Sequence, residues 1–206
     1  MSNKQMNISH IYAGNPLDRG DRERRDEEWL ANRAKDPGSK FLPLWDLKVL
    51  ISNRSDPGLA WLDVDGLRQL EIEASAIFLG LRDHEAYFAI DISKSGNAVR
   101  ELQETEAWRF EDARTVTEYL SGPGSGIVAQ ARAQISWHSR NGFCSICGHE
   151  TFVRRGGHVR QCSKRVLPAS QRRRQWSTEG PWVETGLSFS LHIDANCRSL
   201  FFVGLT

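Results

Sequence analysis

The sequence has no long apolar run and little net charge. None of its apolar runs approaches the roughly 18 residues that a membrane-spanning helix needs, and residues 1–10 are polar, without the apolar core of a signal peptide. The formal net charge is +1, so no overall field draws the chain to nucleic acid or to a membrane. We therefore expect a cytoplasmic protein that has neither membrane nor nucleic acid as a partner.

Cysteine is also scarce, with 4 among 206 residues. In a reducing compartment a Cys-x-x-Cys pair indicates a metal or redox site rather than a structural disulfide. Apolar residues make up 39% and charged residues 26% of the chain, which is slightly polar for a globular protein but does not indicate disorder.

Patterning along the chain predicts an α+β fold with a small, mostly antiparallel sheet and a few helices. The strongest β signal is two apolar runs, 76–81 and 86–91, flanking a short polar connector, which predicts a hairpin with His84 exposed at its tip. A charge-dense segment, 21–34, predicts a surface helix with Trp29 and Leu30 on its buried side. The remaining expected elements are strands at 41–45, 48–52 and 60–64, and helices at 111–120 and 127–138.

Three parts are expected in sequence. The Gly- and Pro-rich segment 121–126 is the best internal boundary. It separates an N-terminal domain, 1–125, from a connecting helix and an incomplete ribbon, 126–164. The composition of the chain changes after residue 164, and we expect residues 165–206 to be a poorly ordered tail.

Three cysteines have the spacing of a metal knuckle. Cys144 and Cys147 form a Cys-x-x-Cys pair followed by Gly148, which permits the left-handed turn that brings both sulfurs to one point. Cys162 follows after Gly156-Gly157, which fits the tip of a hairpin. The second pair reads Cys-x-x-Arg, so a structural Zn²⁺ held here would have three cysteine ligands.

A fourth ligand is not determined by this pattern. His149, His158 and Cys197 are the candidates. The competing interpretations are a degraded ribbon whose thiols hold no metal, and a redox pair, against which the absence of a surrounding βαβ pattern argues.

Several motifs in order resemble the NADH pyrophosphatase (NAD-capped RNA hydrolase) branch of the Nudix hydrolases. They are Asn15-Pro16-Leu17-Asp18-Arg19 with Arg25-Asp26, Phe78-Leu79-Gly80 with the run 87–91, Ala131 through Trp137-His138, Phe143 through Gly148, and 157–162. The resemblance covers about residues 12–164.

The resemblance implies an N-terminal domain, a zinc ribbon and a catalytic Nudix domain. The fourth zinc cysteine of the family would fall at Arg165, and the Nudix box, whose Glu carboxylates hold Mg²⁺ or Mn²⁺, should follow. After Lys164 the carboxylates are Glu179, Glu184 and Asp194, and no two have the i, i+4 spacing that one helix face needs. We therefore assign no catalytic and no cofactor-binding residue, and expect the tail to be translated out of the ancestral frame.

The reaction implied by the resemblance is hydrolysis of NAD(H) to nicotinamide mononucleotide and AMP, and in relatives removal of NAD caps from RNA. We expect this chain alone to be inactive. The alternatives are a zinc-binding interaction module, forming a homodimer or a dimer with a full-length homologue, and a non-functional truncated product. Some relatives are peroxisomal, but residues 203–206 are no such C-terminal signal.

Other residues invite functional interpretations that we consider weaker. The basic cluster 172–174 is expected to be solvated surface, and Trp137-His138 to pack the helix against the ribbon. The charged residues Asp18, Arg19, Arg25 and Asp26 fit an ion-pair network or a charged surface equally well.

Overall fold

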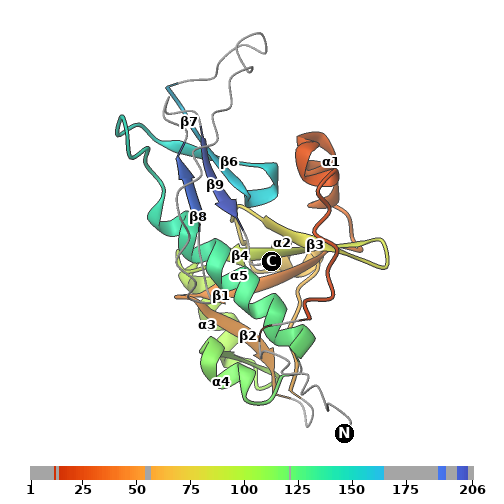
Figure 1. The fold of residues 1–206 in the computed structure, drawn as a ribbon. Coiled ribbons are helices and arrows are strands. Elements are labelled where there is room, and N and C mark those ends of the chain that lie inside the picture. The colour runs from red at the N-terminus through yellow and green to blue at the C-terminus, as the bar shows by residue number, and fades with distance from the viewer. Residues whose placement is uncertain are drawn as a thin grey trace, which may run out of the picture.

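The computed structural model describes residue 12 and residues 14–53, 57–120, 122–164, 190–193 and 199–203. Within them the fold is α+β, as predicted (Figure 1). It contains a five-stranded sheet with helices around it and a smaller sheet that carries the cysteine segment.

The larger sheet has the strand order β3-β4-β1-β2-β5. Its neighbours are antiparallel except for the parallel pair of β1 and β4. The predicted hairpin is confirmed as β3 and β4, joined by Asp83 and His84 in left-handed conformations, with His84 exposed. The strands are β1 (Lys40–Trp45), β2 (Lys48–Ser52), β3 (Ile77–Arg82), β4 (Glu85–Asp91) and β5 (Trp108–Glu111).

Helices cover this sheet, and short polar side chains start several of them. Asp26, Asp63 and Asp112 accept hydrogen bonds from first-turn amides, as N-cap residues do. The predicted surface helix is confirmed with Leu30 buried. The helices are η1 (Glu23–Arg25), α1 (Glu27–Arg33), α2 (Val64–Gln69), α3 (Gly96–Glu104), α4 (Ala113–Thr117) and α5 (Gly122–Arg140).

The longest helix, α5, lies across one face of the sheet (Figure 1). Its residues Ile127, Val128, Ala131 and Ile135 form an apolar stripe that packs in one core cluster with strand residues such as Leu42 and Leu79. The Gly- and Pro-rich segment does not interrupt secondary structure as its composition indicates, because Gly122–Gly126 begin this helix. The requirement to bury the apolar stripe prevails over the low helix propensity of glycine.

Two further expectations need correction. Residues 60–64 are not a strand: Leu59 and Leu62 make isolated bridges to Ile51 and Phe41, and α2 begins at Val64. The helices α2 and α3 and the strand β5 were not predicted, because short elements carry too few periodic residues to stand out.

The second sheet has the order β6-β7-β9-β8. Strands β6 (Thr151–Arg154) and β7 (Val159–Cys162) form the predicted hairpin, with η2 (Arg155–Gly157) as its tip. In the tail, β8 (Ser190–Ile193) and β9 (Ser199–Val203) continue the sheet, with β9 antiparallel to β7; these strands were not predicted. The other residues of 165–206, including the basic cluster 172–174, lie outside the described residues. None of the helices described is long and apolar enough to cross a bilayer.

Candidate metal centre

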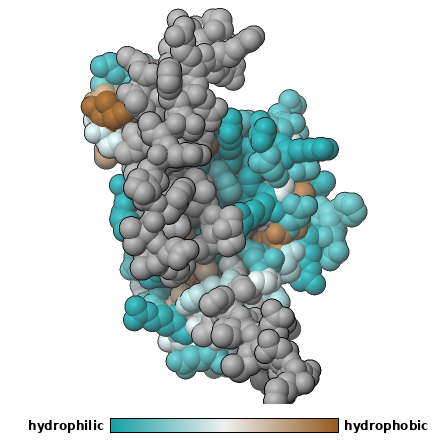
Figure 2. All heavy atoms as spheres, viewed as in Figure 1, coloured by the Kyte–Doolittle hydropathy of each residue, from teal (hydrophilic) through white to brown (hydrophobic). Residues whose placement is uncertain are grey.

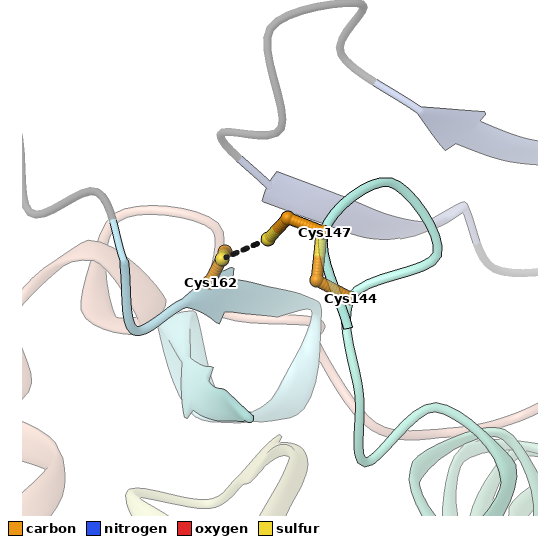
Figure 3. Close-up of side chains that lie close together, drawn as sticks. All are labelled: Cys144, Cys147 and Cys162. Atoms are coloured by element: carbon orange, nitrogen blue, oxygen red, sulfur yellow. Dashed lines mark hydrogen bonds between the residues drawn. The ribbon is translucent and has the colours of Figure 1, made fainter. Parts of the chain in front are cut away.

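Three cysteines from two separate elements converge at one point (Figure 3). Cys144 and Cys147 belong to the loop between α5 and β6, and Cys162 ends β7. Their sulfur atoms all lie within 4.8 Å of one another. Cys144 and Cys162 are buried, whereas Cys147 is partly exposed.

The loop folds as a knuckle because glycine permits its turn. The amide of Gly148 donates to the carbonyl of Cys144 (2.8 Å), and Gly148 has a φ of 70°, a conformation that glycine adopts without strain. The amide of Cys144 donates to the carbonyl of His149 (2.7 Å), which closes the loop.

The sulfur positions fit a thiolate-bound metal ion. Two thiolates that bind one tetrahedral Zn²⁺ at about 2.3 Å are about 3.8 Å apart, and the sulfurs of Cys147 and Cys162 are 3.4 Å apart. Thiolate ligands select Zn²⁺, Cu(I) or iron–sulfur clusters over Mg²⁺ or Ca²⁺. The three cysteines can therefore hold a soft metal ion from three sides.

The two histidines considered as fourth ligands do not join this group. Among the described residues, the ligand group consists of the three cysteines alone. His149 is exposed and its Nδ1 lies 3.0 Å from the carbonyl oxygen of Cys147. His158 follows the hairpin tip, and burial lowers its pKa to about 3. Cys197 lies outside the described residues; it comes two positions before Ser199, the β-pair partner of Gln161.

A buried arginine ties β7, which ends at Cys162, to β6 and α5, the two elements that flank the cysteine loop. Arg160, on β7, donates through Nε to the hydroxyl of Thr151 (2.7 Å) and through Nη2 to its carbonyl (2.9 Å). Its Nη1 lies 2.9 Å from Nδ1 of His138 in α5. Thr151, which pairs with Cys162, also donates to the carbonyl of Asn141 (2.7 Å) at the end of α5.

The contacts of His138 determine its tautomer. Arg160 can only donate, so Nδ1 of His138 accepts and Nε2 carries the hydrogen that is donated to the carbonyl of Gly157 (2.8 Å). Burial lowers the pKa of His138 to about 4, and the charge of Arg160 acts in the same direction. A neutral imidazole therefore joins the helix to the hairpin, so the expectation that Trp137-His138 packs helix against hairpin is confirmed for His138.

Arg24 links the hairpin tip to the larger sheet, and sequence reasoning missed it. Only 3% of this residue is exposed, yet its guanidinium donates to carbonyls of Phe78 (2.7 Å), Leu79 (2.8 Å) and, more weakly, Gly156 (3.4 Å). Burial lowers its pKa to about 10, which leaves it charged at neutral pH. Nothing in the run Arg22-Glu23-Arg24-Arg25 distinguishes this arginine from its exposed neighbours.

Motifs far apart in sequence meet at the same point of β3. Asp18 forms a bridge with Leu81, and the carbonyl of Leu79 also accepts from the side chain of Gln130 in α5. The side chain of Asn15 donates to Gln130 in turn. The carbonyls of this irregular part of β3, where the register shifts between Phe78 and Gly80, are thus occupied by side chains instead of a neighbouring strand.

The charged residues near Asp18 follow the surface interpretation. Arg25 forms an exposed ion pair with Asp21, and Asp26 caps α1. Such exposed pairs contribute little to stability.

The loop that carries Cys144 and Cys147, together with the following strand β6, also exposes apolar side chains. Phe143 is 67%, Ile146 51% and Phe152 48% exposed. Figure 2 shows apolar side chains exposed in this part of the molecule, beside hydrophilic surface.

Comparisons with known proteins agree with this architecture. Residues 38–137 match the family described as an NADH pyrophosphatase-like rudimentary NUDIX domain. The chain is 25% identical over 201 residues to the NAD-capped RNA hydrolase NUDT12 of Homo sapiens and to that of Macaca fascicularis, with 82% of this chain and 43% of each relative covered. It is 30% identical over 115 residues to the chloroplastic Nudix hydrolase 19 of Arabidopsis thaliana, with 47% of this chain and 24% of that protein covered.

The fold and these matches define a Nudix-related protein whose sheet, β1 to β5, together with α5 is the rudimentary NUDIX domain. These matches support a relationship to the NADH pyrophosphatase branch of the Nudix hydrolases. It spans less than half the length of the curated relatives named above.

Proposed function

We propose that this chain is the N-terminal and metal-binding part of an NADH pyrophosphatase-type protein, with a structural Zn²⁺ at Cys144, Cys147 and Cys162. The convergence of the three sulfurs within 4.8 Å carries this proposal. The cysteine loop, the hairpin and the cysteine spacing together correspond to a zinc ribbon that has lost its fourth cysteine at Arg165. The ion would tie the end of α5 to β7, and its role would be structural.

Metal analysis of the purified chain tests the structural part of the proposal. We expect about one zinc per chain after dialysis, and loss of most of it in Cys144→Ser. Ser145→Ala is a matched control, because it changes a residue of the same loop that has no thiol. This variant should retain the zinc. A wild-type chain that retains no zinc under reducing conditions would refute the proposal.

We propose that this chain alone does not catalyse the reaction of its family. The family reaction is metal-assisted hydrolysis of the pyrophosphate of NAD(H), and it needs several carboxylates around Mg²⁺ or Mn²⁺. The 206 residues contain no Nudix box. Incubation with NADH, or with NAD-capped RNA, and Mn²⁺ should release no AMP or capless RNA above background; release by the purified chain would contradict this.

A second candidate function is a dimerisation module, and the exposed side chains of Phe143, Ile146 and Phe152 favour it. We propose a second copy of the chain as the partner, with a full-length homologue as the other outcome of the test. Light scattering at micromolar concentration should give a dimer mass, and Ile146→Ser with Phe152→Ser should give a monomer. A wild-type chain that is a monomer would refute dimerisation and leave the proposed metal binding unaffected. A wild-type chain that binds neither metal nor a second copy would fit a non-functional truncated product.

A further inference from the structure

The two elements that supply the cysteines need to be held in register. Cys144 follows the end of α5 after only the three residues Asn141, Gly142 and Phe143, so its position depends on that helix. Cys162 ends β7, on the other side of the site. Three thiolates bind one ion tightly only if the helix and the strand keep a constant separation, because metal–ligand distances vary by no more than about 0.2 Å.

A partly buried contact between His138 and Arg160 helps to set this separation, beside the bond from Thr151 to the carbonyl of Asn141. His138, two residues before the last residue of α5, binds Arg160 through Nδ1 (2.9 Å) and the tip carbonyl of Gly157 through Nε2 (2.8 Å). Arg160 lies two residues before Cys162 and is 9% exposed. Arg160 also donates to Thr151, the pairing partner of Cys162, and more weakly to the backbone carbonyl of His138 (3.4 Å).

We propose that His138, acting through Arg160, is a positioning residue for the metal centre: it holds β7 against α5 so that Cys162 meets Cys144 and Cys147. The inference rests on the proposed metal binding. His138 binds no metal itself, since among the described residues the group of close ligand atoms contains only the cysteines.

The contact is suited to this task because it is directional and partly shielded from solvent. A guanidinium offers donors in a rigid planar fork, and here the fork is shared between Thr151 on one side and His138 on the other. An apolar contact would allow sliding between helix and strand, whereas hydrogen bonds of 2.7–2.9 Å do not. Residues that orient metal ligands in this indirect way typically change metal affinity 10- to 100-fold when replaced.

Zinc affinity, measured by competition with a chromophoric chelator, tests the proposal on the full chain. His138→Ala should weaken the affinity about 10- to 100-fold. His138→Asn, whose side-chain oxygen can replace Nδ1 as the acceptor from Arg160, should restore most of it, whereas His138→Gln, which replaces the donor at Nε2, should not. Ser139→Ala, on the exposed side of the same helix, is the matched control and should bind as the wild type does.

A second measurement covers the case in which His138→Ala folds poorly. In the wild type, zinc should slow amide hydrogen exchange at the end of α5, including the amide of Asn141, which donates to the carbonyl of Trp137, because coupling between two sites is reciprocal. A purely structural role would lower the melting temperature equally with and without zinc and leave the affinity unchanged. Unchanged affinity in His138→Ala, or unchanged exchange in α5, would overturn the proposal. A wild type that binds no zinc would instead refute the proposed function on which it rests.

Discussion

Replacing Gly157 by alanine should undock the hairpin tip from the larger sheet. Gly157 has a φ of 94°, and a Cβ atom there would lie 2.6 Å from Cγ2 and 3.1 Å from Cδ1 of Ile77. Ile77 is only 2% exposed and belongs to β3, so it has little room to move. The same Cβ would lie 3.2 Å from Nε2 of His138, the donor to the carbonyl of Gly157.

Two terms determine the magnitude. A left-handed conformation costs an L-residue about 1–2 kcal/mol, and an extra methyl group in a packed site costs about 1–3 kcal/mol. A loss of about 3 kcal/mol in the free energy of unfolding is therefore expected. For a chain of this size each kcal/mol lowers the melting temperature by about 2–4 °C, so the shift should be roughly 6–12 °C.

Thermal and urea unfolding followed by circular dichroism measure this loss. Gly96→Ala is the matched control, because a Cβ at the start of α3 meets no atom within 4 Å; it should leave stability unchanged or raise it by up to about 1 kcal/mol. If Gly157→Ala melts within about 2 °C of the wild type, the tip is not seated on Ile77, and the reasoning about this interface is wrong.

Three further predictions follow from the same region. Burial lowers the pKa of His138 to about 4 and that of His158 to about 3, so the unfolded chain takes up protons before the folded chain does and the free energy of unfolding should fall between about pH 6.5 and 3. His138 alone should contribute a loss of about 2 kcal/mol between pH 7.5 and 5, measured by urea unfolding. A free energy of unfolding that does not change over this range would contradict the burial of His138. Arg24→Met should destabilise the chain by about 2–4 kcal/mol, since buried carbonyls lose a charged donor, whereas the exposed Arg100→Met should change the midpoint of urea unfolding little; equal effects of the two would argue against the buried link. Cys197→Ser should weaken zinc binding measurably if that thiol is the fourth ligand, and an affinity equal to that of the wild type would eliminate it.

Local patterns predicted the elements in which chemistry and geometry coincide. The hairpin of β3 and β4 was predictable because two apolar runs rich in β-branched and aromatic residues flank a polar connector. The knuckle was predictable because Cys-x-x-Cys-Gly is a local turn whose sulfurs need no distant partner to face one another.

Patterns failed where distant residues decide the outcome. The segment 121–126 resembles a linker, yet it is helical because α5 buries its apolar stripe on the sheet. Arg24 resembles any surface arginine, and its burial follows from the free carbonyls at the register shift of β3 and from the nearby hairpin tip. Strands β8 and β9 were missed because a strand needs a neighbour, and theirs is β7.

The sequence by itself determined the family resemblance, the α+β class and the identity of three candidate metal ligands, since these depend on residue types and on short spacings. Only the tertiary structure decided that Cys162 reaches Cys144 and Cys147, that His149 and His158 stay out of their group, and that His138 and Arg24 join the hairpin to the N-terminal domain. The physical reason is that burial and hydrogen bonding depend on how the chain packs. A charged side chain is stable inside the protein only where backbone carbonyls that lack other donors accept its hydrogen bonds, and these carbonyls come from segments that are far apart in the sequence.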